Sequence, residues 1–394
     1  MNKRYRVVAS IALLAGASLA VAQQVPGPPG PPGGARGPGG GPPGGGPAGG
    51  FVLALPPYYT NKSAPLATVD TAAADLACKV QGHARLVCLA DLVKKGMAPE
   101  LLTRLQLPYS VQDGKKWSNF PPLVYHDRVG VTLAEFSAAQ LGAVKAILKE
   151  STGIAANEGY DEIEQILNAD DFLKANSTQT GFASGNFQMA FLGTPAVKGT
   201  WQLYFGGHHI ALSMTYKDGA LAGATPSFRG VEPFTTYNAN GRDNAPLAQE
   251  QAAFAAALRA LSPAEQSKAH LAQTYTDLIA GAQNDDNFPA TKTGVRAGDL
   301  SPEKRTLLLT AIDKYVGDIH RPDAAALMSK YRGELADTWL SYSGTPLLTA
   351  ENDYLRIDGP SLWLEFSMQP GRIIPGVHPH SVWRDRSADY GGNR

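Results

Sequence analysis

Four of the eight histidines in the sequence fall in two short clusters that could bind a metal ion. His208 and His209 are adjacent and follow two glycines, whereas His378 and His380 stand two positions apart. Residues two apart in an extended segment point to the same face, so His378 and His380 can both reach one ion. In a regular strand His208 and His209 point to opposite faces. Only one of them is therefore expected to join the other pair, unless the glycines twist the chain locally.

The number of imidazole ligands would decide the kind of metal site. Three imidazoles that leave one position open resemble a catalytic zinc site, and four nitrogen ligands suit copper. We therefore predict a divalent transition metal, zinc or copper, held by residues from the set His208, His209, His378 and His380. The alternative is one histidine bonded in the core, one on the surface and a solvated H-P-H turn.

Three charged residues near these clusters are candidate catalytic residues. Glu365 is a carboxylate in the apolar segment 362–366, and burying such a group is costly unless it is paired or hydrogen-bonded. It could be a metal ligand, a partner of a ligand or a general base, and Glu232 and Arg384 are similar candidates. Alternatively, Glu365 faces water on an edge strand, and salt bridges explain Glu232 and Arg384.

The other four histidines are weaker candidates for metal binding. His83 and His270 are expected in helical stretches among polar neighbours, and His126 has no partner nearby in the sequence. His320 is expected near a helix C-terminus, where the helix dipole favours a cation.

Alternating aromatic and branched residues predict the strands that position the histidine clusters. Such runs occur over 185–216 and again over 335–384, with Gly and Pro between them. Trp201, Leu203 and Phe205 should share one face of a strand and pack in the core. The two regions are predicted to form one antiparallel sheet, packed with helical layers in an α+β fold.

Helical signals dominate the first third of the domain and return in its middle. Between 71 and 174 apolar residues recur at helical spacing, and Thr132 and Glu135 have the form of a capping box. Further helices are predicted over 246–261 and after Ser262-Pro263 and Ser301-Pro302, where Ser would be the N-cap and Pro the first helical residue.

Cys78 and Cys88 are the only two cysteines. In an oxidising compartment such a pair most often forms a disulfide, which is the prediction here. The alternative, a metal site of both cysteines and His83, lacks a fourth ligand nearby.

The N-terminus predicts export. Residues 1–22 combine three basic residues with an apolar run ending in Ala20-Val21-Ala22, which is typical of a cleavable signal peptide. Residues 23–50 are mostly Gly and Pro and predict a disordered linker. Residues 51–394 are expected to form one large globular domain, periplasmic or secreted, with no transmembrane anchor after cleavage.

Charge and motifs exclude several classes of function. Four of the 35 basic residues precede Phe51 and none of the 35 acidic residues does, so 51–394 carry a net charge of −4. This argues against a nucleic-acid partner, which requires clustered positive charge. No nucleophile elbow, dinucleotide fingerprint, phosphate loop or H-E-x-x-H helix occurs, so the commonest serine hydrolase, nicotinamide, nucleotide and zinc-protease interpretations are removed.

Several ordered motifs carry a family resemblance. They are WQLYFGGHH at 201–209, TPSFRGVEP at 225–233, Gly359-Pro360 with Glu365, HPHSVWRD at 378–385 and DYG at 389–391. Together they resemble the bacterial proteins grouped as domain of unknown function 3500, from about Thr71 to the C-terminus. The resemblance implies that G-H-H, G-x-E-P and H-x-H-x-x-x-R-D belong to one domain, as a shared metal site would need.

Three functions are compatible with these observations. The first is an exported metal-dependent enzyme, a hydrolase or oxidoreductase, with Glu365 or Glu232 as base. The second is a non-catalytic accessory protein of the cell envelope that binds metal or a polymer through the same histidines. The third is a purely structural exported domain. The partner would be a small molecule or an envelope component.

Overall fold

The computed structural model of the protein describes residues 55–393. The predicted signal peptide (1–22) and Gly/Pro-rich linker (23–50) lie outside the described residues. Among the described residues, no helix is long and apolar enough to cross a membrane.

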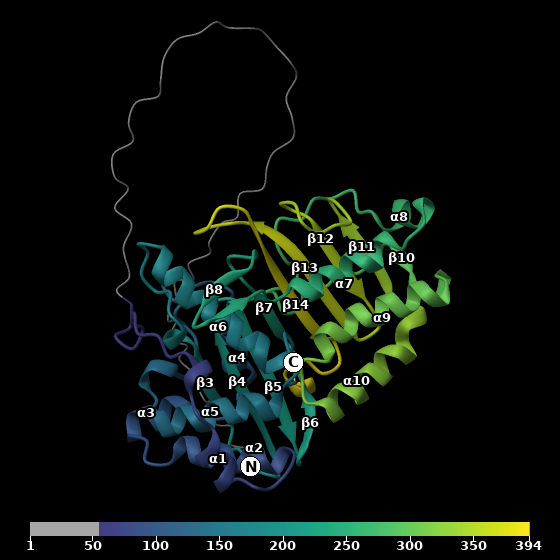
Figure 1. Ribbon diagram of the computed structural model, residues 1–394. Coiled ribbons are helices and arrows are strands. Elements are labelled where there is room, and N and C mark those ends of the chain that lie inside the picture. The colour runs from purple at the N-terminus through teal and green to yellow at the C-terminus, as the bar shows by residue number, and fades with distance from the viewer. Residues whose placement is uncertain (1–54, 394) are drawn as a thin grey trace, which may run out of the picture. The chain divides into compact units, whose positions relative to one another are not determined.

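A twelve-stranded sheet runs through the molecule (Figure 1). Its strands are β1 (Gln106–Leu107), β2 (Val131–Thr132), β3 (Gln188–Leu192), β4 (Thr200–Gly207), β5 (Ile210–Lys217), β6 (Ala220–Gly223), β7 (Ser227–Gly230), β10 (Val295–Arg296), β11 (Trp339–Ser343), β12 (Tyr354–Asp358), β13 (Leu362–Pro370) and β14 (Val377–Asp385). The order is β1-β3-β4-β5-β7-β14-β13-β12-β11-β10, with β2 beside β3 and β6 beside β5. All pairs are antiparallel except β1 with β3. The predicted α+β class and the single sheet from both regions are confirmed.

The short strand β7 joins the two halves of the sheet. It pairs on one side with β5 and on the other with β14, so that Phe228 lies opposite both Ala211 and Val382. Four residues are too few to show a clear alternation, and this strand was not predicted from the sequence. Through β7, the β4–β5 hairpin and β14 become close neighbours although they are far apart in the chain.

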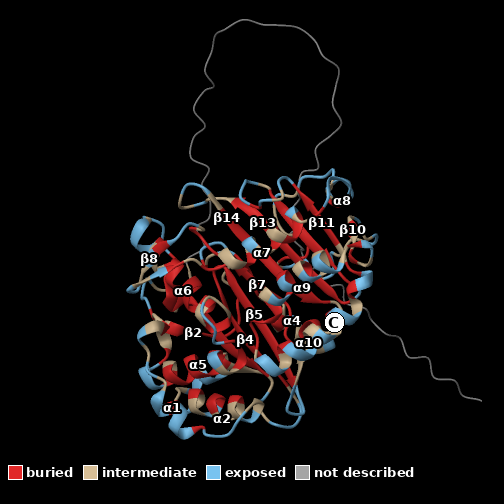
Figure 2. Ribbon diagram, turned by 45° about the vertical axis from the view of Figure 1, so that its right-hand side comes forward, coloured by how far each residue is buried: buried red, intermediate tan, exposed pale blue. Residues whose placement is uncertain are grey.

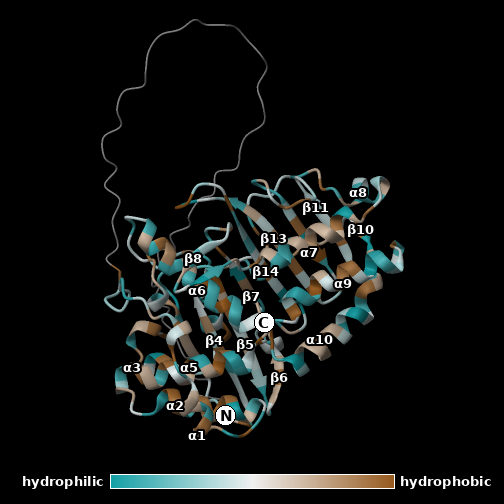
Figure 3. Cartoon of the chain, in the orientation of Figure 1, coloured by the Kyte–Doolittle hydropathy of each residue, from teal (hydrophilic) through white to brown (hydrophobic). Residues whose placement is uncertain are grey.

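Ten helices accompany the sheet in the described part of the chain. They are α1 (Ala72–Ala77), α2 (His83–Lys94), α3 (Pro99–Leu105), α4 (Val111–Gly114), α5 (Ala138–Ser151), α6 (Gly159–Asn176), α7 (Ala248–Arg259), α8 (Pro263–Ala269), α9 (Pro302–Val316) and α10 (Arg321–Glu334). In Figures 1 and 2, α5, α6, α7 and α9 lie in front of the sheet, whose strands are almost entirely buried. These helices carry both hydrophobic and hydrophilic residues (Figure 3), as expected when one side of each contacts the sheet.

The largest apolar cluster lies between these helices and the sheet. Trp201, Leu203 and Phe205 are all part of it, which confirms their predicted shared face. On β13, Phe366 packs edge-on against Phe254 of α7, with ring centroids 5.4 Å apart. Interlocked apolar side chains of this kind are the main stabilising contribution of such a core.

The predicted N-caps start two of the helices as expected. Ser262 accepts a hydrogen bond from the backbone of α8, and Ser301 does the same for α9. The Thr132 capping box is also present, but it caps a short 3-10 turn at Leu133–Glu135. Helix α5 begins only at Ala138, because Ser137 forms a second capping box there.

Loops cover the opposite face of the sheet. One of them, residues 277–285, is here called the strap. Leu278 and Ala282 of the strap pack against a second apolar cluster that includes Trp117 and Val382. This face carries the side chains of alternate residues on β14, beginning with His378 and His380.

The predicted disulfide between Cys78 and Cys88 is confirmed, with a Cα–Cα distance of 5.8 Å. It links the end of α1 to the second turn of α2. The bond closes a loop of ten residue steps around the start of α2, which restricts the unfolded chain.

Candidate functional site

His208 and His209 form the tight turn between β4 and β5. Gly207 pairs with Ile210, so the two histidines are the central residues of a hairpin. His209 takes a left-handed conformation with φ of 62°, whereas neither preceding glycine has a positive φ. A Cβ on Gly207 would lie 2.6 Å from Cδ1 of Phe187. Glycine is therefore required there for close packing, and the expected twist comes from His209.

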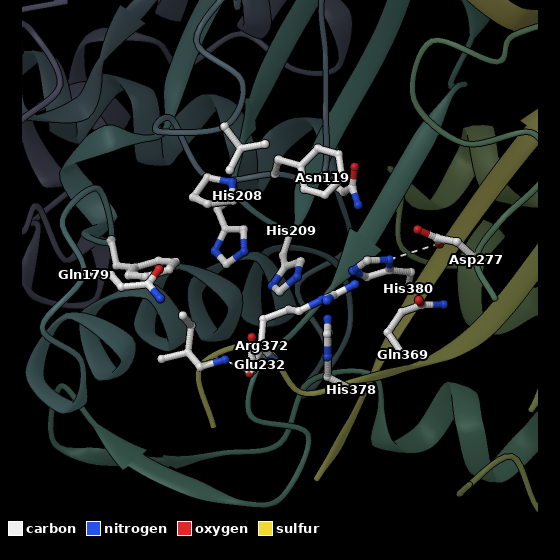
Figure 4. A pocket seen from close by; sticks show the side chains of 15 residues that line it. Asn119, Gln179, His208, His209, Glu232, Asp277, Gln369, Arg372, His378 and His380 are labelled. Carbon is white, nitrogen blue, oxygen red and sulfur yellow. Dashed lines mark hydrogen bonds and ion pairs between the residues drawn. The ribbon is translucent and has the colours of Figure 1, made fainter. Parts of the chain in front are cut away.

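His209 converges with His378 and His380, as the sequence predicted for one member of the adjacent pair. His378 and His380 lie on the same face of β14, opposite Gln369 and Ser367 of β13. The ring centroids of His209 are 5.3 Å from those of both other histidines, which are 4.9 Å apart. One nitrogen of each ring lies within 4.8 Å of the other two, so these three imidazoles surround a common point (Figure 4).

The three imidazoles are buried, and those of His209 and His378 resist protonation. Burial and the nearby His380 lower the pKa of His378 to about 2. Burial, together with His208, lowers the pKa of His209 well below its usual value. Nδ1 of His378 is buried and has no hydrogen-bond partner among the described residues. Imidazole nitrogens gathered around one point are the donors that a transition metal requires, so this triad fits a metal ion.

His208 contacts this group without being one of its three members. Its ring stacks on His209 with a centroid distance of 3.8 Å. Its Nδ1 lies 2.6 Å from the carboxylate of Asp170 on α6, and both side chains are buried. This contact holds the His208 ring in place, and the stacking in turn orients His209 at the buried turn of the hairpin.

Asp277 of the strap orients His380. Its Oδ1 lies 3.1 Å from His380 Nδ1. Burial acts to raise the pKa of Asp277, but His380, the N–H group of Leu278 and Arg372 together outweigh it, and the pKa is lowered. A carboxylate on one imidazole nitrogen leaves the other nitrogen free to bind metal. Sequence reasoning missed Asp277, because it lies in a polar loop about a hundred residues from His380.

The triad of His209, His378 and His380 opens into a cavity of about 400 Å³. Its walls come from six separate stretches of the chain, 119–124, 179–182, 208–209, 232, 277 and 369–380 (Figure 4). They are lined by Asn119, Phe120, Pro121, Val124, Gln179, Phe182, His208, Glu232, Asp277, Gln369, Arg372 and Ile373. A concave, mostly apolar lining with a few polar groups is typical of a small-molecule site.

Glu232 lies in the wall of this cavity. Its Oε1 accepts hydrogen bonds from the backbone N–H groups of Arg372, Ile373 and Ile374, at 2.7, 2.7 and 2.8 Å. The carboxylate thus fixes the loop between β13 and β14, which carries Arg372. In Figure 4 the Arg372 side chain reaches toward the histidines.

Glu365 lies on the same face of β13 as Ser367 and Gln369, but it does not line the cavity. Its two oxygens accept four hydrogen bonds, from the N–H groups of Ile279 and Ala280, Tyr354 Oη and Trp363 Nε1, at 2.7 to 2.9 Å. Burial raises the pKa of Glu365, while these donors oppose the shift. Two of the four donors belong to the strap, so Glu365 anchors the segment that presents Asp277.

Arg384 anchors the same strap further along. It is fully buried, and its guanidinium donates to the carbonyls of Ala280 and Gly281 at 2.7 and 3.1 Å. It also pairs with Asp285, at 2.8 Å, and with Asp389. His380, Glu365 and Arg384 therefore hold successive parts of the strap, and only the first of them lines the cavity.

Comparison with known proteins identifies the family of this chain. Residues 80–392 match the family described as "Protein of unknown function (DUF3500)". No curated protein and no solved structure matches the chain. The match covers most of the sequence and includes every motif that builds the cavity. The chain therefore belongs to the DUF3500 family.

Proposed function

We propose that this protein is an exported, metal-dependent enzyme, a hydrolase or oxidoreductase, that acts on a small molecule in the histidine cavity. His209, His378 and His380 would bind the ion, zinc or copper. The signal-like residues 1–22 and the disulfide support a location in the periplasm or outside the cell.

One observation carries the proposal. Three buried imidazoles from two segments about 170 residues apart each bring a nitrogen to one shared point beside a single cavity. A cation bound at that point would accept a lone pair from each of the three nitrogens. Apolar packing alone does not explain why three histidines gather at a site open to a small molecule.

A bound ion would supply Lewis-acid chemistry, and copper would add redox chemistry. Asp277 would keep the proton on Nδ1 of His380. Glu232 is the candidate general base. It lines the cavity, and only its Oε1 accepts the hydrogen bonds from the loop between β13 and β14, so Oε2 is not used in those contacts. Arg372 would attract a negatively charged group of the substrate. Glu365 and Arg384 would act as positioning residues through the strap.

A non-catalytic accessory protein that binds metal or an envelope polymer is the second candidate. The observation in its favour is that the polar atoms of Glu365 and Arg384 form hydrogen bonds with the strap and are therefore not directed at a substrate. In that case Glu232 also serves only to fix its loop. Metal binding is common to both functions, and turnover of a substrate separates them.

Metal analysis of full-length protein, purified without a polyhistidine tag, tests the proposal. We expect about one equivalent of zinc or copper to disappear in a His378→Ala/His380→Ala variant, because two of three ligands are lost. His270→Ala, at an exposed histidine, is the matched control and should keep its metal. Equal metal content in the double variant and the control would overturn the proposed site.

A further inference from the structure

A second group of metal-ligand side chains lies away from the cavity. His83 is the first residue of α2, His320 precedes α10, and Asp323 lies in the first turn of α10. One ligand atom of each lies within 4.8 Å of the other two. Their side chains are 16, 30 and 19% exposed, so solvent and ions can reach them.

Asp323 holds the two histidines together. Its Oδ2 lies 3.0 Å from Nε2 of His83 and 2.9 Å from Nδ1 of His320. Sequence reasoning did not identify this group. It placed His320 near a helix C-terminus. In the structure His320 lies four residues after the end of α9 and is also the N-cap of α10, one turn before Asp323.

The contacts of His83 favour a positive charge at this position, carried by either a proton or a metal ion. Its Nδ1 lies 2.7 Å from the carbonyl oxygen of Gly219, which can only accept, so Nδ1 carries a hydrogen. A neutral ring then has a lone pair on Nε2, which faces the carboxylate of Asp323. Two electron-rich atoms at 3.0 Å repel each other unless a proton or a metal ion lies between them.

We propose that Nε2 of His83, Nδ1 of His320 and Oδ2 of Asp323 bind a zinc ion in a second site, independent of the cavity. Two imidazoles and a carboxylate are a common zinc ligand set. The Gly219 carbonyl fixes the ring of His83 in the way that outer partners orient metal-bound histidines. Because all three side chains are partly exposed, water could complete the coordination.

The disulfide prepares this site for binding. Cys78 and Cys88 enclose His83, and Arg85 in the same turn pairs with Glu150 of α5 at 3.1 Å. Both contacts restrict the start of α2 before an ion binds, which lowers the entropic cost of ordering the ligand. A zinc ion here would join α2 to α10 across 240 positions of sequence.

The first test uses the full chain carrying His378→Ala/His380→Ala, so that the cavity cannot contribute. Zinc titration followed by calorimetry should show about one remaining site, which disappears on adding His83→Ala or Asp323→Asn. Adding His270→Ala instead should leave that site intact. Loss of all zinc binding in the cavity variant, or unchanged binding after His83→Ala, would overturn the proposal.

The second test needs no variant and guards against loss of folding. Wild-type protein is treated with diethylpyrocarbonate with and without zinc, and modified peptides are measured by mass spectrometry. Zinc should reduce modification of His83 and His320 several-fold and leave His270 unchanged. Equal modification of His83 and His320 with and without zinc would contradict the second site.

Discussion

The histidine cavity and the ion cluster around Arg229 show two different ways to bury polar groups beside one short strand. Arg229 of β7 is 1% exposed, with Nε 2.9 Å from Glu162 and Nη1 2.6 Å from Asp318, both fully buried. The next residue, Gly230, donates its N–H to the carbonyl of His209 at 2.8 Å. The two regions are thus one residue apart on β7.

The difference lies in how charge is compensated. Around Arg229, opposite charges neutralise each other within the core, and α6, α7 and α9 close the space. In the cavity, residues 55–393 supply no carboxylate that pairs with His378 or His209, and burial instead keeps their imidazoles uncharged. A closed ion cluster serves the fold, whereas uncharged ligands around an open cavity remain available to a cation from outside.

Replacing Arg229 should have the largest effect on stability. Arg229→Met leaves Glu162 and Asp318 buried without their cation, and such a loss costs about 3–5 kcal/mol of unfolding free energy. Urea denaturation followed by circular dichroism measures it. Arg259→Met, at an exposed position on α7, should change stability by less than about 0.5 kcal/mol. An Arg229→Met variant as stable as this control would show that the cluster contributes little.

Replacing Glu365 should have an intermediate effect on stability, and it should also loosen the strap that carries Asp277 into the cavity wall. In Glu365→Gln the side-chain NH2 group would face N–H donors that now bind a carboxylate oxygen. The lost hydrogen bonds should lower the unfolding free energy by about 1–3 kcal/mol. The strap should also exchange its amide hydrogens faster, as measured by mass spectrometry over residues 277–285. The control is Glu351→Gln at an exposed position. Unchanged exchange in the strap would contradict the anchoring role.

The smallest effect is on the pH dependence of the unfolding free energy, which should differ between the ion cluster and the cavity. Burial raises the pKa of Glu250 well above its usual value, and the nearby Glu162 and Asp318 raise it further. A raised carboxyl pKa stabilises the fold below the ordinary value of 4.5, and this contribution is lost as pH rises toward the folded-state pKa.

Glu250→Gln stays neutral at every pH, so its unfolding free energy should fall less than that of the wild type as pH increases above 4.5. Denaturant titrations at several pH values measure the slope. His378→Gln is the comparison from the cavity, and its unfolding free energy should fall more than that of the wild type between pH 4.5 and 6.5. His378 is uncharged in the folded protein but protonates in the unfolded chain over this range, so the wild-type residue adds stability as pH rises. Parallel slopes for Glu250→Gln and the wild type would refute the ion cluster as the source of pH dependence.

The sequence by itself determined features that depend on local spacing. The Ser caps at Ser262 and Ser301 act within one turn of helix. The shared face of Trp201 and Phe205, and of His378 and His380, follows from the two-residue period of a strand. The disulfide followed from cysteine count and compartment.

Only the tertiary structure decided which of these residues meet. The turn conformation of His209, the bridging role of β7 and the contact of Asp277 with His380 each depend on chain segments brought together by the sheet order. Periodicity carries no information about such pairings, because a strand exposes the same alternation whichever neighbour it acquires. For the same reason His83 and Asp323, 240 positions apart, were not recognisable as partners until the packing of α2 against the start of α10 placed them together.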